Sequence, residues 1–138
     1  MSFRDLLQEL AEGRAVKIVI EGDGASMQGI VRHGCVLTLT PVKDFREVQV
    51  GEIVFTRWRG GNHLLHLVRE IQGGQFLIVN SLGKMNGWVP GTDILGRVTE
   101  IQDTGETDIL KLVSLHQQTA KTFIVATQTQ PSDKSDGC

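Results

Sequence analysis

The sequence lacks three features that would each have placed it in a broad class. It has no run approaching the roughly 18 uninterrupted apolar residues typical of a membrane span. It has only two cysteines, Cys35 and Cys138, too few for a disulfide framework. It has no excess of positive charge, because 14 Lys and Arg stand against 16 Asp and Glu. These absences argue against a transmembrane segment and against nucleic-acid binding by general attraction to phosphate.

The cysteines and the N-terminus together suggest a compartment. Cys138 follows a polar stretch, so no structural bridge to Cys35 is expected and both are predicted to be free thiols. Residues 1–5 lack the basic start and apolar core of a secretory signal. We therefore expect a cytoplasmic protein.

Length and composition fit a single globular domain. The chain has 138 residues, of which 40% are hydrophobic and 22% charged. We expect residues 1–126 to form one domain, and the polar residues 127–138 to be a disordered tail.

The first residues have helical spacing. Phe3, Leu6, Leu7 and Leu10 recur along one face, and Gly13 is placed to end the helix. The polar face is more acidic than basic, which disfavours a helix lying on a membrane. We expect this short amphipathic helix to pack on the domain's own sheet, with docking to a partner as the alternative.

Most of the remaining chain has the composition of strands. Aliphatic and β-branched runs alternate with glycine-containing turns, at residues 15–21, 35–40, 52–58, 64–71, 75–80 and 94–102. The pairs Gly60-Gly61 and Gly73-Gly74 predict tight hairpin turns and a meander over residues 52–80. The sequence therefore predicts a mainly β fold.

Three other segments complete this outline. Residues 108–124 carry apolar residues roughly on one side and predict a possible C-terminal helix, although their Thr and Gln content lowers helix propensity. Residues 42–50 and 81–93 read as longer, more polar loops. Either loop is suited to wall a substrate cleft.

One serine and one histidine are placed as a catalytic pair would be. Ser26-Met27 lies in a glycine-rich turn after the apolar run 16–20, and His66 lies within the later run 64–68. A hydroxyl attacks poorly until a neighbouring base takes its proton, and an imidazole suits that task near neutral pH. This pattern indicates a Ser-His dyad.

Short blocks in the same order resemble the signal peptidase and LexA-type repressor peptidase superfamily. Its nucleophile motif, Gly-x-Ser-Met-x-Pro, is matched by residues 24–29, and its Gly-Asp-Ile-Val block by residues 51–54. The histidine form of its base motif, His-Arg-Val, is matched by residues 66–68, and its Ile-x-Gly-x-Val block by residues 94–98. The resemblance spans about residues 16–102.

The resemblance implies a fold and an activity. The fold would be the coiled β-fold of that superfamily, and the activity a serine endopeptidase with Ser26 as nucleophile and His66 as base. Backbone N–H groups of Ser26 and Met27 would form the oxyanion site, and Met27 would help to line the groove. The substrate would be an extended protein segment or the chain's own tail, laid as a strand along the cleft, and no cofactor is expected.

The sequence also departs from the motifs of that superfamily. Gly29 stands in place of the proline, Cys35 in place of an aspartate, and Leu67 in place of the arginine after the base. Residues 80–83 lack the Gly-Asp pair that often lies near the dyad. The alternative function is therefore a catalytically inactive module that binds an extended peptide by strand addition.

A third group usually fixes the tautomer of a catalytic imidazole. Asp93, at the start of the last predicted strand, is a candidate, and Asn86 and Ser81 are alternatives. Lys84 is an alternative base. A metal site is disfavoured, because residues three apart in a strand, as His63 and His66 are, point to opposite faces.

Overall fold

The computed structural model describes residues 3–22, 31–80 and 83–126. Its α-helices are α1 (Phe3–Ala11) and α2 (Ile109–His116), and its 3-10 helices are η1 (Phe45–Glu47), η2 (Arg59–Gly61) and η3 (Gly91–Asp93). Its strands are β1 (Val16–Glu21), β2 (Cys35–Pro41), β3 (Ile53–Arg57), β4 (His63–Gln72), β5 (Gln75–Val79), β6 (Met85–Pro90), β7 (Ile94–Asp103) and β8 (Thr122–Ala126). The predicted mainly β fold with a short N-terminal helix is confirmed.

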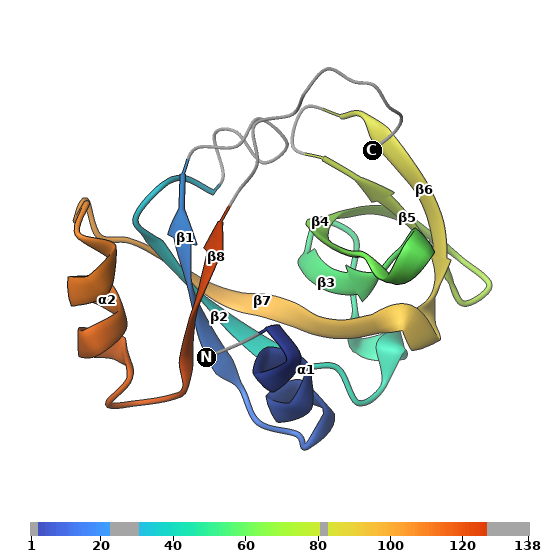
Figure 1. The fold of residues 1–138 in the computed structure, drawn as a ribbon. Coiled ribbons are helices and arrows are strands. Elements are labelled where there is room, and N and C mark those ends of the chain that lie inside the picture. The colour runs from blue at the N-terminus through green and yellow to red at the C-terminus, as the bar shows by residue number, and fades with distance from the viewer. Residues whose placement is uncertain (1–2, 23–30, 81–82, 127–138) are drawn as a thin grey trace.

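All these strands belong to one sheet, in the order β6-β5-β4-β3-β7-β2-β1-β8. Neighbours are antiparallel except for β8, which runs parallel to β1. The predicted meander is confirmed in β3, β4 and β5, and Gly73 and Gly74 make the β4–β5 turn with φ of 54° and 81°. Figure 1 shows β7 passing between the β1–β2 part and the β3–β6 part of the curved sheet.

The segment 81–93, predicted as a loop, contains β6, so that prediction is wrong. Gly87 and Pro90 interrupt the aliphatic pattern that would have indicated a strand. The glycine is required by packing, because a Cβ at Gly87 would lie 3.2 Å from the Cη2 atom of Trp58. The β6 backbone thus passes close to the indole that follows β3.

The helix predicted over residues 108–124 is too long. Asp108 accepts a hydrogen bond from the Lys111 backbone N–H at 3.2 Å and caps α2, which ends at His116. The following residues 117–121 are mostly polar and do not continue the apolar face. The β-branched run Thr122–Ala126 forms β8 instead, because it pairs with the edge of β1.

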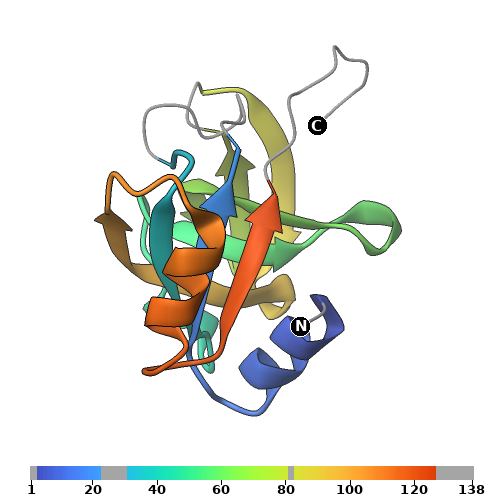
Figure 2. The same ribbon diagram turned by 60° about the vertical axis from the view of Figure 1, so that its left-hand side comes forward.

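The two α-helices pack on opposite faces of the β1–β2 part of the sheet (Figure 2). Leu6 and Leu10 of α1 join a core cluster with Ile18, whereas Leu112 of α2 packs against Val19 on the other face. The prediction that the first helix packs on the domain's own sheet is therefore confirmed.

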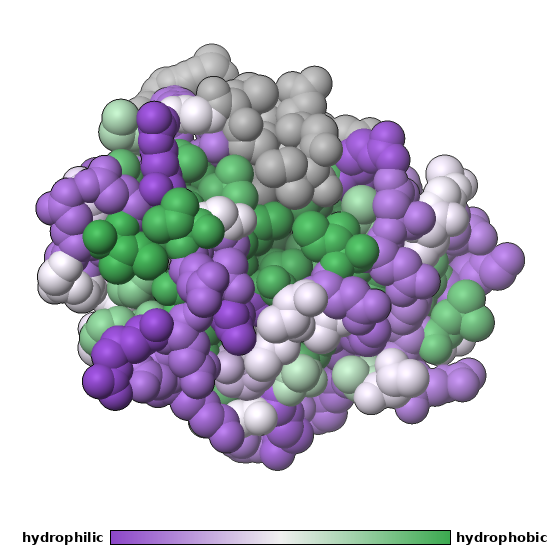
Figure 3. Space-filling model, turned by 180° about the vertical axis from the view of Figure 1, so that it is seen from behind, coloured by the Kyte–Doolittle hydropathy of each residue, from purple (hydrophilic) through white to green (hydrophobic). Residues whose placement is uncertain are grey.

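A separate core cluster fills the space enclosed by the β3–β6 part of the sheet. Its buried members are Val48, Val54, Val68, Phe76, Ile78, Val89 and Ile94. On the surface, apolar side chains lie in separate patches when the molecule is seen from behind (Figure 3). No helix of the described residues is long and apolar enough to cross a bilayer.

Glu9 fixes the position of α1. Its side chain is only 7% exposed and accepts hydrogen bonds from Arg14 Nε at 2.7 Å and from Arg14 Nη2 at 3.0 Å. Lys121 Nζ lies 3.2 Å from the same carboxylate. The hydrogen bond from Arg14, assisted by Lys121, lowers the pKa of Glu9 to about 2. The carboxylate therefore connects α1 to the residue that precedes β8.

Candidate functional site

His66 lies within β4 and faces the core enclosed by β3 to β6. In the β3–β4 ladder it stands opposite Val54. Its neighbours on the same face of the strand, Leu64 and Val68, belong to the apolar cluster that contains Val54. The residue is 8% exposed. The imidazole therefore sits in apolar surroundings, where a charged ring would be poorly solvated.

A backbone carbonyl fixes the tautomer of this ring. The Nδ1 atom of His66 lies 2.6 Å from the carbonyl oxygen of Leu65. Because a carbonyl can only accept, Nδ1 carries the hydrogen, and the neutral ring has an unprotonated Nε2. Burial lowers the pKa of His66, and the hydrogen bond to Leu65 opposes this effect. A neutral ring with a lone pair on Nε2 is the form that a general base requires.

The predicted nucleophile, Ser26, and its neighbour Met27 lie outside the described residues. The strand that leads into their segment is anchored where β1 ends. There the backbone N–H of Gly22 donates to Nδ1 of His33 at 2.8 Å, and Gly22 has a φ of 92° that favours glycine. The other nitrogen of His33 lies 3.2 Å from the Thr107 carbonyl oxygen, so this imidazole joins β1 to the segment before α2.

The structure gives Asp93 a partner other than His66. Asp93 ends η3, and its carboxylate accepts a hydrogen bond from Arg57 Nε at 3.5 Å. Its backbone carbonyl accepts from the Thr56 hydroxyl at 3.0 Å. Among the described residues, the carbonyl of Leu65 is the group that orients the His66 ring. The predicted orienting carboxylate is thus replaced by main chain.

The alternative candidates fall in different settings. Asn86 lies on β6, and its side-chain oxygen is buried without a hydrogen-bond partner among the described residues. Ser81 lies outside the described residues. Lys84 is exposed just before β6, and its backbone N–H donates to the Asn80 side chain at 2.9 Å. Its place at the surface is that of a solvated lysine, whereas a lysine base requires burial.

His63 points to the opposite face of β4 from His66, as the strand period predicts. Its ring stacks on Phe55, with centroids 5.3 Å apart and an interplanar angle of 13°, and meets the Phe3 ring edge-on at 4.9 Å. Burial and then the charge of Arg57 lower the pKa of His63. The two histidines therefore do not share a ligand. Within the described part of the chain, no three His, Cys, Asp or Glu side chains are grouped to hold a metal ion.

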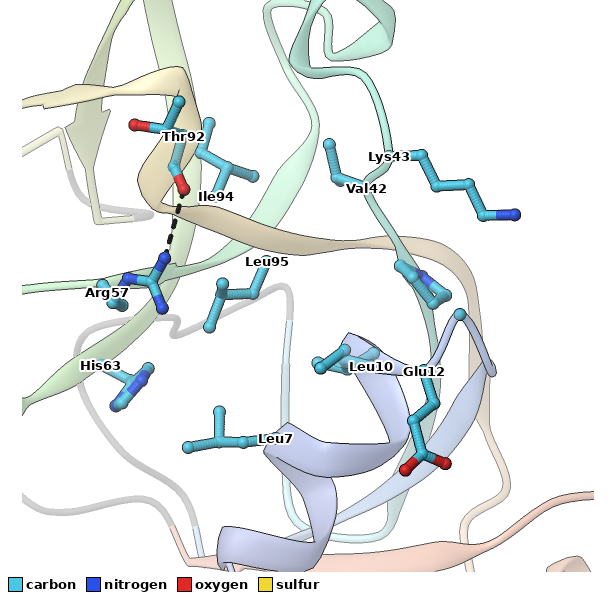
Figure 4. A pocket seen from close by; sticks show the side chains of 13 residues that line it. Leu7, Leu10, Glu12, Val42, Lys43, Arg57, His63, Thr92, Ile94 and Leu95 are labelled. Carbon is cyan, nitrogen blue, oxygen red and sulfur yellow. Dashed lines mark hydrogen bonds between the residues drawn. The ribbon is translucent and has the colours of Figure 1, made fainter.

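A cavity of about 560 Å³ opens on the His63 side of β4. It lies between α1, the start of β7 and the end of β3, and Figure 4 shows its side chains. Its apolar lining includes Leu7, Leu10, Val42, Ile94 and Leu95, and its polar lining includes Glu12, Lys43, Arg57, His63 and Thr92. The loop 42–50, predicted to wall a cleft, contributes two of these residues. His66 is not among the lining residues.

Sequence reasoning missed Arg57 and the Leu65 carbonyl. The main-chain acceptor has no side-chain signature, so no motif would have identified it. Arg57 stands opposite His63 in the β3–β4 ladder. That cross-strand pair follows from the hairpin register at Gly60-Gly61, which is the signal that would have found it.

Comparisons of this chain with protein-family models, with curated proteins and with solved structures found no match.

Proposed function

We propose that this chain is a serine endopeptidase in which His66 is the general base and Ser26 the nucleophile. The observation that supports it is the state of His66, a buried neutral imidazole whose Nδ1 hydrogen is held by the Leu65 carbonyl. This arrangement leaves Nε2 as the proton acceptor. The identity of the nucleophile rests on the motif at residues 24–29.

In the proposed reaction, the Ser26 oxygen attacks the carbonyl carbon of a peptide bond while its proton moves to Nε2 of His66. The backbone N–H groups of Ser26 and Met27 stabilise the oxyanion. The C–N bond then breaks, and His66 gives the proton to the leaving amine. Water attacks the resulting ester with the same base, which releases the acid and restores the serine.

The proposed substrate is a protein segment in extended conformation. It would come from another protein or from the chain's own terminal residues, in the cytoplasm. In the sheet of the described residues, β6 and β8 are the edge strands, and an edge strand can pair with an added peptide strand. Neither a cofactor nor a nucleic acid takes part in this reaction.

Labelling with a fluorophosphonate, read by intact mass, tests this proposal. Wild type should gain one adduct that maps to Ser26, and Ser26→Ala should gain none. His66→Leu should fold and also remain unlabelled. Ser114→Ala is the matched control, because Ser114 is exposed on α2 and its removal should leave labelling unchanged. An adduct that persists in folded His66→Leu would exclude His66 as the base.

A ring that is only 8% exposed also gives a substrate little access to Nε2, which favours a second candidate, an inactive peptide-binding module on the same fold. Strand β6, at one end of the sheet of the described residues, exposes Met85 and Trp88 at 61% and 44%. Such a module would bind extended peptides by strand addition and remain unlabelled by the fluorophosphonate. Selection of peptides from a random library on wild type and Trp88→Ser, followed by mass analysis of the bound peptides, separates the two functions. Intact peptides that depend on Trp88 indicate binding without cleavage.

A further inference from the structure

We propose that the cavity beside α1 binds a small amphipathic carboxylate, with its apolar chain on the leucines of α1 and β7 and its carboxylate on Arg57 and His63. This site lies on the opposite face of β4 from His66. It does not depend on whether the chain is a peptidase.

The cavity has the size and the apolar floor of a small-molecule site. Its volume of about 560 Å³ falls within the range of roughly 300–1,000 Å³ that is usual for ligand pockets. Leu7 and Leu10 line it from α1, and Ile94 and Leu95 line it from the start of β7. Leu7 and Leu95 are only partly buried, so an alkyl chain placed there would cover apolar surface now open to water.

Arg57 provides the positive charge at one end. Its contacts within the described residues are long: Nε lies 3.5 Å from Asp93 Oδ1, and Nη2 lies 3.4 Å from the Thr92 carbonyl oxygen. The side chain is 55% exposed. Figure 4 shows the guanidinium on the same side of the cavity as His63. A ligand carboxylate can therefore take donors that the present contacts use weakly, and the paired geometry of arginine suits it.

His63 adds a neutral donor beside that charge. Its ring is held between Phe55 and Phe3, and neither ring nitrogen forms a hydrogen bond with another described residue. A neutral imidazole has one N–H, which can donate to a carboxylate oxygen. The positive charge of Arg57 and the N–H group of His63 therefore lie at the same end of the cavity.

The other end of the cavity does not offer a comparable anion site. Glu12 is engaged by Gln8 Nε2 at 2.9 Å and by Arg14. Figure 4 shows Lys43 extending outward, away from Arg57. The carboxylate is therefore assigned to the Arg57 end and the chain to the leucines, and a cationic or neutral head group would lose the attraction.

The test compares three probes with the same alkyl chain: decanoate, decanol and decylammonium. Affinities are measured by calorimetry below the aggregation concentration of each probe, and methyl NMR shifts locate the bound chain. Decanoate should bind about tenfold tighter than decanol and shift the methyl signals of Leu7 and Leu95. Decylammonium should bind more weakly than decanol.

Variants assign the contacts. Arg57→Gln should reduce decanoate affinity about tenfold and leave decanol affinity unchanged. Thr92→Trp, at an exposed rim position, should fill the cavity and weaken both probes. Arg46→Gln is the matched control, because Arg46 is 82% exposed and outside the lining.

Four results would each overturn the proposal. They are absence of binding at millimolar decanoate, equal affinity for decanoate and decanol, decanoate affinity unchanged in folded Arg57→Gln, and methyl shifts confined to α2 or β6. Fluorophosphonate labelling of the same samples is expected to be unaffected by Arg57→Gln, so failure of one proposal is distinguishable from failure of the other.

Discussion

Replacing His66 with leucine should remove a specific part of the pH dependence of stability. The folded ring is 8% exposed, and burial lowers its pKa. In the unfolded chain a histidine binds a proton with an ordinary pKa of about 6.5. Acid therefore favours the unfolded chain, so stability from this residue is present above that pKa and is lost as the pH falls below it.

The loss of stability that His66 causes on acidification has an upper limit. If the folded ring stays neutral, proton binding favours the unfolded chain by about 2 kcal/mol at about pH 5 relative to pH 8. His66→Leu should lack this loss while remaining within about 1 kcal/mol of wild type at about pH 8, because one hydrogen bond to Leu65 is exchanged for apolar packing.

Urea unfolding at both pH values measures the difference between wild type and variant. His66→Gln is the matched control, since it also cannot titrate but packs differently. In both variants the free energy of unfolding should lack the His66 contribution to its pH dependence, even if their absolute stabilities differ. If wild type and the two variants lose equal stability on acidification, the folded ring titrates normally and the argument from burial is wrong. The assignment of His66 as a neutral base would then lose its support.

Three further predictions follow from the described contacts. Glu9→Gln should lower the thermal midpoint of unfolding at neutral pH. The difference in midpoint between variant and wild type should shrink as the pH falls from about 4.5 to about 2. A difference that stays constant across that range would show that the ion pairs of Glu9 are not its cause. Gly91→Ala should cost about 1–3 kcal/mol by urea unfolding, because a Cβ there would lie 2.3 Å from Phe45 Cγ; an unchanged midpoint would mean that the ring moves freely. Arg57→Gln should raise the pKa of His63 in an NMR titration, because the neighbouring charge is removed while the burial that also lowers it remains; a lower or unchanged pKa would contradict this cause.

The strands that the sequence predicted, β1 to β5 and β7, carry aliphatic runs bounded by glycine turns, whereas β6 and β8 do not combine the two. In the predicted strands, composition and turn residues therefore indicate the same element. In β6, glycine is required because Trp58 packs against Gly87, and that contact cannot be seen in the local sequence. The pairing of β8 with β1 joins residues about a hundred positions apart, so local propensity does not predict it.

The site was predictable only where a side chain carried the signal. The position of His66 in a strand and its separation from His63 followed from the period of β4. The strand period did not predict the group that orients the ring, because that group is the carbonyl of Leu65 and not the carboxylate of Asp93. The cavity was also hidden, since its walls come from α1 and from loop and strand segments distant in the sequence.

The register of β4 places its two histidines in different chemical settings. His66 faces an apolar core and loses its charge to burial, whereas His63 faces a cavity beside Arg57. A shift of the strand by one residue would exchange the two faces and move His66 out of the apolar core to the face that carries His63. The turn at Gly60-Gly61 and the Arg57–His63 pair set that register. Insertion of one residue in this turn should therefore perturb both the fluorophosphonate labelling and the binding of decanoate. If neither is perturbed, the register of β4 is fixed by the core and not by the turn.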